Sequence, residues 1–400
     1  MSTDVAAVPS AARAALTTAV QRIRQGEVGS LPVIAGLVLI WAVFDILNPN
    51  FLTPGNLTNL AVQTADIGIV AVGIVLVLLL GEIDLSVGSV YGLGSAVMAV
   101  LNVKMGMGAV PAVLGGILTG TLVGTLHGFW YTRFRIPSFV VTLAGLLAWF
   151  GLQLRVLGET GTINIYDPRV DQLAGQFFPA EFGWALAAAV VVLLVISLVV
   201  RRRRRAAAQL VQNGLIADVG GLVVVAAAIF GANAVLAADR GVPLALLILL
   251  AFVVGFDLIT KRTGFGRHIF AVGGNAEAAR RAGISVNGIR IAVFALSGTL
   301  AAAGGIMGAS RLLAVNYSSG TGDVLLDAIA AAVIGGTSLF GGRGTVWSAL
   351  TGALVIQSIG NGLALLSVAA DVKYMITGAV LLAAVTIDGV ARQGRQRAGV

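Results

Sequence analysis

Residues 67–80 read IGIVAVGIVLVLLL, fourteen positions without a polar side chain, and GEIDLSVGS follows directly at residues 81–89. With the residues before it, the apolar run reaches the ~20 residues that a helix needs to cross a bilayer. The whole 400-residue chain is 58% hydrophobic and 11% charged, whereas about a quarter of the residues of a soluble protein are charged. We therefore predict an all-α integral membrane protein, because continuous rather than alternating apolar runs exclude a β-barrel.

Twelve apolar ranges are candidates for membrane spans, which predicts a polytopic helical bundle of about 10–12 transmembrane segments. Two of the segments, near residues 81–100 and 325–342, are rich in glycine, serine and acidic residues, a composition typical of re-entrant or broken helices. The twelve ranges are 31–47, 60–80, 85–103, 108–130, 138–155, 183–200, 217–237, 242–260, 290–309, 325–341, 346–367 and 373–390.

The basic residues indicate how the chain is oriented in the membrane. With a cytoplasmic N-terminus, 20 of the 26 lysines and arginines fall on the cytoplasmic side, as the positive-inside rule requires. We expect residues 1–30 to be a cytoplasmic tail rather than a cleavable signal peptide, residues 31–390 to be the transmembrane domain, and residues 391–400 to be a cytoplasmic tail. The arginine run 201–205 follows an apolar range directly, so it is interpreted as an anchor facing anionic membrane lipid.

Several classes of protein are excluded by what the chain contains. It has no cysteine, and its two histidines, His127 and His268, are far apart and lack metal-ligand spacing, so no metal site is predicted. No nucleophile and base stand together, so an enzyme is not expected. The net charge of +8 is explained by orientation in the membrane rather than by nucleic acid. There is no G-x-x-x-x-G-K-[ST] motif, so the chain does not bind ATP through such a loop.

The two acids of GEIDLSVGS pose a separate question. On a continuous helix Glu82 and Asp84 lie about 200° apart, so we predict that the helix breaks at Gly81. Asp84 is then expected to cap a new helix that starts at Leu85. Glu82 is a candidate for a gate, a dimer contact or the cytoplasmic side of a transport path, and an alternative function is an ion-coupled carrier in which both acids take protons. The predicted break and gate residues are Gly81, Glu82, Asp84, Ser86 and Gly88.

The most polar cytoplasmic loop, residues 261–289, contains the segment NAEAARRAG. Asn275 is a good N-cap, alanine and arginine favour a helix, and Gly283 is a good stop signal. Two interpretations of this short helix are equally compatible with its composition. Either it docks into a groove of another protein, or it lies on the lipid headgroups.

Glu277-Ala278-Ala279, followed after three residues by Gly283, resembles the coupling-helix motif of bacterial ABC importer permeases. Almost the whole chain, about 30–390, resembles the monosaccharide branch of that family, and the extra pair of spans around the arginine run most resembles the xylose type. The chain has ISVNGIR where other importers have an Ile-x-Leu-Pro ending, as the sugar branch does. The stretches that carry the resemblance are GEIDLSVGS (81–89), IPSFVVTLAGLLA (136–148), GRHIFAVGGNAEAARRAGI (266–284) and LDAIAAAVIGGTSLFGGRGTV (326–346).

The resemblance implies a permease in the bacterial inner membrane, without a cofactor of its own. It implies a separate cytoplasmic ATPase that binds ATP and Mg, an extracytoplasmic sugar-binding protein and a permease homodimer. It also implies that the short helix of the loop docks on the ATPase. The coupling residues implied in this way are Asn275, Glu277, Ala278, Ala279, Arg280, Arg281 and Gly283.

A neutral sugar needs hydrogen-bonding groups along its path, without a deep affinity well. Polar residues within apolar spans are therefore candidates for the lining. The alternative for each is a hydrogen bond between helices, which contributes about 0.6–2 kcal/mol. The candidates are Gln63, Thr64, Asp66, Ser138, Thr142, Asp327, Gln357, Ser358 and Asn361.

The long extracytoplasmic loop, residues 158–183, is mostly polar. It is interpreted either as a surface for an external partner or as a solvated connector.

Overall fold

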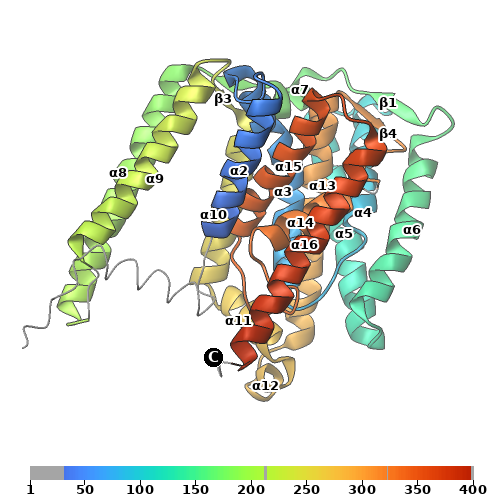
Figure 1. The fold of residues 1–400 in the computed structure, drawn as a ribbon. Helices are drawn as coiled ribbons and strands as arrows, with labels where there is room; N and C mark the ends of the chain where they lie inside the picture. The colour runs from blue at the N-terminus through green and yellow to red at the C-terminus, as the bar shows by residue number, and fades with distance from the viewer. Residues whose placement is uncertain (1–30, 211–213, 322, 398–400) are drawn as a thin grey trace, which may run out of the picture.

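The computed structural model describes residues 31–210, 214–321 and 323–397; the predicted tail 1–30 lies outside them. It is a bundle of helices, and each of the twelve predicted apolar ranges contains one (Figure 1). Within the described residues, nine helices are long and apolar enough to cross a membrane. The helices in the twelve ranges are α2 (Leu31–Leu47), α3 (Pro54–Leu79), α4 (Val87–Ala99, continued by the π-helix η1, Val100–Lys104), α5 (Ala109–Phe134), α6 (Ser138–Leu157), α8 (Ala180–Ala207), α9 (Leu215–Ala237), α10 (Leu244–Arg262), α13 (Val286–Leu312), α14 (Asp323–Ile334), α15 (Trp347–Leu365) and α16 (Ala370–Arg397).

Helix α3 is the centre of the bundle. It packs against α10, α13, α14 and α15, and its residues from Thr64 to Leu79 are all buried. A buried helix in a membrane protein can be apolar on every face, because it never contacts water. This explains why the run IGIVAVGIVLVLLL lacks any polar position.

Small residues bring α5 and α13 into close contact, as expected from the abundance of glycine in this chain. On α5, glycines recur every four residues from Gly116 to Gly128, so they share one face. A Cβ atom at Gly120 would overlap the carbonyl oxygen of Gly298, and one at Gly124 would overlap that of Phe294. The two backbones therefore touch at positions where only glycine fits.

Both predicted helix interruptions are present. Helix α3 ends at Leu79, and a non-helical segment runs through residues 80–86 before α4 begins. Helix α14 has only 12 residues, about 18 Å at 1.5 Å per residue, which is shorter than the ~30 Å core of a bilayer. After α14, a loop of residues 335–346 continues to α15.

The loop of residues 158–183, predicted to be extracytoplasmic, is folded rather than irregular. It forms β1 (Thr162–Asn164), α7 (Pro168–Gly175) and β2 (Phe177–Phe178). β1 pairs antiparallel with β4 (Ala314–Asn316), and β2 pairs with β3 (Val242–Pro243). Asp167 caps α7, and the hydrogen bond that it accepts from Asn102 is the main cause of its lowered pKa. Ile163 and Val170 are buried against the bundle, because alternate apolar side chains of the loop cover the helix ends.

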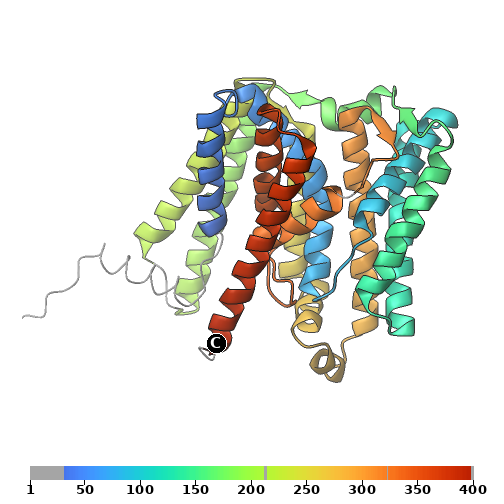
Figure 2. The same ribbon diagram turned by 45° about the vertical axis from the view of Figure 1, so that its right-hand side comes forward.

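Two short helices lie at the opposite end of the bundle from the strands: α11 (Gly264–Gly274), which we did not predict, and α12 (Ala276–Arg281) (Figures 1 and 2). We call these two ends the α12 end and the strand end. Helix α16 runs on through Arg397, so most of the predicted C-terminal tail, residues 391–400, is helical. The paired helices α8 and α9 stand apart from the bundle over most of their length, as Figure 1 shows.

Candidate functional site

Helix α12 has both of the predicted caps. The side-chain oxygen of Asn275 accepts hydrogen bonds from the amides of Glu277 and Ala278, at 3.1 and 2.9 Å. At the other end, Gly283 has φ of +83°. The amides of Gly283 and Ile284 donate to the carbonyls of Arg280 and Ala279, both at 3.0 Å. This is a Schellman motif, and its left-handed residue is most easily glycine. Local sequence therefore defines a helix of only six residues.

The outer face of α12 is charged and its inner face is apolar. Ala279 is buried on the core, whereas the side chains of Glu277, Arg280 and Arg281 are 57%, 56% and 80% exposed. Glu277 forms ion pairs with both arginines, at 2.6 and 3.5 Å. The helix lies beyond the ends of the long helices, where it is open to solvent (Figure 2). A rigid, charged projection of this kind is suited to contact with another protein.

Backbone contacts connect α12 to the helix break. Helix α11 leads into α12 and ends at Gly273 and Gly274. A Cβ atom at Gly273 would overlap the carbonyl oxygen of Leu79, the last residue of α3. The same carbonyl accepts a hydrogen bond of 2.9 Å from the amide of Gly342, in the loop after α14. We call this meeting of three backbones, at Leu79–Gly81, Gly273–Gly274 and Phe340–Gly342, the glycine junction.

Glycine is required at the junction for two reasons. Gly81, Gly341 and Gly342 have φ values of +76°, +82° and +70°, in the left-handed region that other residues rarely adopt. Gly273 is instead required for close approach, since a side chain there would displace the end of α3. The backbones of α11, the break and the loop after α14 are therefore in direct contact, without a flexible side chain between them.

Asp84 does not cap a helix at Leu85, so that prediction is wrong. Helix α4 begins two residues later, at Val87, with Ser86 as its N-cap. The Asp84 carboxylate is buried and accepts hydrogen bonds from the amide and hydroxyl of Ser86, at 3.0 and 2.6 Å. It also accepts one of 2.9 Å from the hydroxyl of Ser297 on α13. The carboxylate closes an Asx turn within the break and connects that turn to α13.

His127 and Trp149 extend this network. The Trp149 indole donates to Nε2 of His127 at 2.8 Å, so this nitrogen carries no proton and Nδ1–H faces the Ser86 hydroxyl at 3.2 Å. Ser86 in turn donates to Asp84. The chain of hydrogen bonds gives each member a partner, which a buried polar group requires. It holds the break against α5 and α6.

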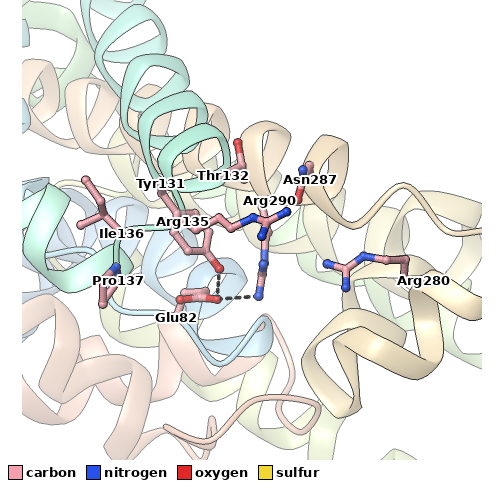
Figure 3. Close-up of a pocket in the computed structure, with 9 residues that line it drawn as sticks. All are labelled: Glu82, Tyr131, Thr132, Arg135, Ile136, Pro137, Arg280, Asn287 and Arg290. Carbon is pink, nitrogen blue, oxygen red and sulfur yellow. Dashed lines mark hydrogen bonds and ion pairs between the residues drawn. The ribbon is translucent and has the colours of Figure 1, made fainter.

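Glu82 faces the α12 end rather than the interior network. Its carboxylate accepts hydrogen bonds from the Tyr131 hydroxyl and, at 3.1 Å, from the Arg290 guanidinium (Figure 3). Arg290 also lies over the Tyr131 ring, 4.9 Å from its centroid. We call this group the Glu82 latch, because it joins the break to the ends of α5 and α13. It forms part of a cavity of about 710 Å³ whose other lining residues include Arg135 and Arg280.

The predicted path residues fall into separate groups. Ser138 and Thr142 support the break, accepting hydrogen bonds from the amides of Ile83 and Leu85 at 3.4 and 3.1 Å. Asn361 of α15 donates to Gln63 of α3 at 3.3 Å, which joins two helices.

The remaining candidates are dispersed over three helices. Thr64 bonds to the Leu60 carbonyl of its own helix. Asp327 is buried on α14. Ser358 accepts a hydrogen bond from Trp41, and Gln357 is half-buried on the same helix, α15. Neither the Glu82 cavity nor the adjoining one is lined by any of the predicted path residues.

Asp66 of α3 pairs with Arg311, in the last turn of α13, at 3.3 Å. The side chain of Asp66 is 4% exposed and that of Arg311 is 33% exposed. Removing water from a carboxylate is unfavourable unless a cation or hydrogen bonds replace that water, and the Ile67 amide supplies a further bond of 2.8 Å. The pair therefore joins α3 to α13 at a buried position.

Sequence reasoning missed several residues of the site, above all Tyr131, His127, Trp149 and Arg290. Arg290 is 208 positions from Glu82 and Tyr131 is 49. The available signal was that Tyr131 and Arg290 lie near the ends of their spans that we predict to be cytoplasmic. Among the described residues, no group of three or more His, Cys, Asp or Glu side chains is arranged to hold a metal ion.

Comparison with known proteins gives a consistent result. The family described as branched-chain amino acid transport system / permease component matches residues 56–385. The xylose transport system permease protein of Escherichia coli K12 is 38% identical over 361 residues, 90% of this chain and 91% of its own length. The corresponding Haemophilus influenzae protein is 34% identical, over 88% and 94% of the two chains. The ribose import permease protein of E. coli K12 is 33% identical, over 89% and 92%. No solved structure matches the chain.

Proposed function

This chain belongs to the family of permease components of branched-chain amino acid transport systems, and we propose that it is the membrane permease of an ATP-driven sugar importer. The observation that carries the proposal is the similarity to xylose and ribose permeases along about nine-tenths of each chain. The chain itself is a transport subunit and not an enzyme.

A monosaccharide is the proposed substrate, and xylose the favoured one. The family description names branched-chain amino acids, but the named relatives carry xylose or ribose in their names, and the xylose permeases are the more similar. A sugar also suits the chemistry of the break, where amides and hydroxyls outnumber charges. Neutral hydrogen-bonding groups are what a molecule covered with hydroxyls needs.

We propose that α12 docks on a cytoplasmic ATPase, which binds ATP and Mg. Its defined caps, its exposed charges and its position beyond the other helices all support this role. The residues concerned are Asn275, Glu277, Ala278, Ala279, Arg280, Arg281 and Gly283. The glycine junction supplies a route from that contact to the transport path, because α11 abuts the end of α3.

In this proposal the α12 end of the bundle is cytoplasmic. Helices α5, α8 and α10 end there with Arg133, with Arg204 and Arg205, and with Lys261 and Arg262, an excess of positive charge that suits the inner side. Both termini then lie in the cytoplasm of a bacterium, and the cytoplasmic coupling loop corresponds to residues 261–289. The arginine run 201–205 faces anionic lipid.

The strand end then faces an extracytoplasmic sugar-binding protein. Its folded loop, with α7 and the two small sheets, forms a rigid surface for such a partner. Two copies of the permease on two ATPase sites are proposed from the family resemblance.

The break residues Gly81, Glu82, Asp84, Ser86 and Gly88 are proposed as an inner gate. In the described conformation the Glu82 latch holds the break to α13, which starts shortly after α12. In this proposal a displacement of α12 changes the position of the gate through two sets of contacts, those of the glycine junction and those of Arg290. Gln63, Thr64, Ser138, Thr142, Asp327, Gln357 and Asn361 remain the proposed lining of the path.

An ion-coupled carrier is not favoured. In such a carrier Glu82 and Asp84 would exchange protons with water, but Asp84 is buried among hydroxyl donors and Glu82 is held by Arg290 and Tyr131.

Reconstitution in proteoliposomes tests the function. The chain is compared alone, with a proton gradient, and with its ATPase, its binding protein and ATP, using labelled xylose and ribose. We expect uptake only with the complete set, and stronger competition by xylose. Uptake driven by a proton gradient in the absence of the ATPase would contradict the proposal.

A further inference from the structure

The cavity beside the Glu82 latch adjoins a second cavity. The second, of about 550 Å³, shares Thr132, Arg135 and Asn287 with the first. The two therefore form one compound site at the α12 end, between the end of α5 and the beginning of α13. Its first part is polar and its second part includes Phe129 and Ile291.

The polar part carries more positive than negative charge. Arg135, Arg280 and Arg290 line it together with one acid, Glu82. Figure 3 shows the guanidinium groups of Arg135 and Arg280 directed into the space from opposite sides. Within the described part of the chain, Arg135 forms no ion pair, and Nε of Arg290 is buried without a hydrogen-bond partner. Arg280 pairs with Glu277 through one nitrogen, Nη1. The site thus offers charged donors of Arg135 and Arg290 that no described residue pairs with, beside the remaining N–H groups of Arg280.

The second part lies beside an exposed aromatic surface of α5. Phe129 is 46% exposed there. On the same helix Trp130 and Phe134 are also exposed and pack together, with ring centroids 5.0 Å apart. Aromatic side chains of this kind are typical of the boundary between headgroups and acyl chains. A ligand that fills both parts needs an anionic head and an apolar tail.

We propose that the compound site binds an anionic phospholipid of the inner leaflet. The phosphate accepts hydrogen bonds from Arg135, Arg280 and the free Nε of Arg290, and an acyl chain lies along Phe129 and Ile291. Basic pockets between membrane helices on the cytoplasmic side bind headgroups in this way. The leaflet rests on the proposed orientation of the chain. Since the lipid contacts both the Glu82 latch and α12, it occupies the space between gate and coupling helix.

The test measures lipid binding directly. The purified full chain is titrated with phosphatidylglycerol or phosphatidylcholine, and retained lipid is counted by native mass spectrometry, without sugar, ATP or the ATPase. The variants are Arg135→Asn, which tolerates the left-handed conformation found there (φ +56°), and Arg135→Asn combined with Arg280→Gln. The matched control is Arg281→Gln, which removes the same charge from α12 outside both cavities.

We expect wild type and Arg281→Gln to bind phosphatidylglycerol alike. At about 1 kcal/mol per basic residue, binding weakens roughly 5-fold in the single variant and roughly 30-fold in the double variant. Equal retention in the double variant and the control overturns the proposal. So does complete competition by inorganic phosphate with no preference for phosphatidylglycerol, which identifies a site for free anions. None of these outcomes depends on transport, so failure here leaves the proposed function standing.

Discussion

Helices α3 and α9 are almost equally apolar, yet they occupy opposite environments. The most apolar stretch of α3 is 94% buried within the protein, whereas that of α9 is 0% buried. Composition predicts both as membrane spans and does not distinguish them. The difference lies in the contacts that the small residues of each helix make with neighbouring helices.

On α3, glycines are contact points. A Cβ atom at Gly73 would lie 3.2 Å from the backbone of Ser297 on α13, and one at Gly68 would lie 2.8 Å from Leu249 on α10. On α9, Gly220, Gly221 and Gly231 have open space around them. In a lipid environment, apolar surface gives no preference for protein over lipid, so packing of small residues and polar contacts decides which helix enters the core.

The largest difference in stability between the two helices is expected when a glycine of each is replaced by leucine. Gly73→Leu forces α3 away from α13, and we expect a loss of about 3 kcal/mol or more. Gly221→Leu meets no neighbour and replaces the weaker helix former, so stability should change by no more than about 1 kcal/mol. Thermal unfolding of the purified variants in one detergent measures both. Equal effects would mean that α9 has a protein partner.

Each helix also carries an ion pair, which offers the next comparison. Asp66→Asn leaves Arg311 without its buried partner, and we expect a loss of roughly 2–4 kcal/mol. Asp218→Asn weakens one ion pair of Arg202 in the first turn of α9, where the two side chains are 20% and 26% exposed, and the loss should stay below about 1 kcal/mol. The same unfolding measurement applies. A loss at Asp218 as large as that at Asp66 would show that the α8–α9 pair is stabilised by charge rather than by lipid.

A smaller loss of stability is expected in the break that follows α3. Asp84→Asn keeps a side-chain oxygen for the Ser86 amide, so it should lower stability by about 1 kcal/mol. Asp84→Ala leaves two buried hydroxyls and an amide without their acceptor, and the loss should rise to about 2–3 kcal/mol. Uptake should fall in the same order. Equal, complete loss of uptake in the Asn variant with unchanged stability would show that the charge itself takes part in transport.

Local features of the fold could be predicted from sequence. The break at Gly81 followed from the angular separation of two acids, and the ends of α12 followed from Asn275 and Gly283, because each depends on residues a few positions apart. The prediction that Asp84 is an N-cap was wrong. Ser86 is the N-cap of α4, and the Asp84 carboxylate accepts a hydrogen bond from Ser297 on α13 instead.

Long-range features could not be predicted. Hydropathy identified α14 as apolar but not its end after 12 residues, and the polarity of residues 158–183 concealed the alternate buried positions that fold them onto the bundle. The partners of Glu82, Tyr131 and Arg290, are brought to it by the packing of α5 against α13. The glycines allow these helices to approach closely, but they do not determine which side chains meet Glu82. The resemblance to a family supplied a role for α12 that its composition left undecided between a protein and the membrane surface.

We infer that movement of α12 reaches the proposed gate through the glycine junction, and two adjacent glycines test this coupling. An alanine at 273 would overlap the end of α3, whereas a Cβ atom at Gly274 meets nothing within 4 Å. The measurement is sugar taken up per ATP hydrolysed by the reconstituted importer, for Gly273→Ala and Gly274→Ala, after gel filtration shows both variants folded. We predict that Gly273→Ala lowers this ratio about tenfold, within the usual range of coupling between sites, while Gly274→Ala stays near wild type. An unchanged ratio in Gly273→Ala, or an equal fall in both variants, would contradict the claim.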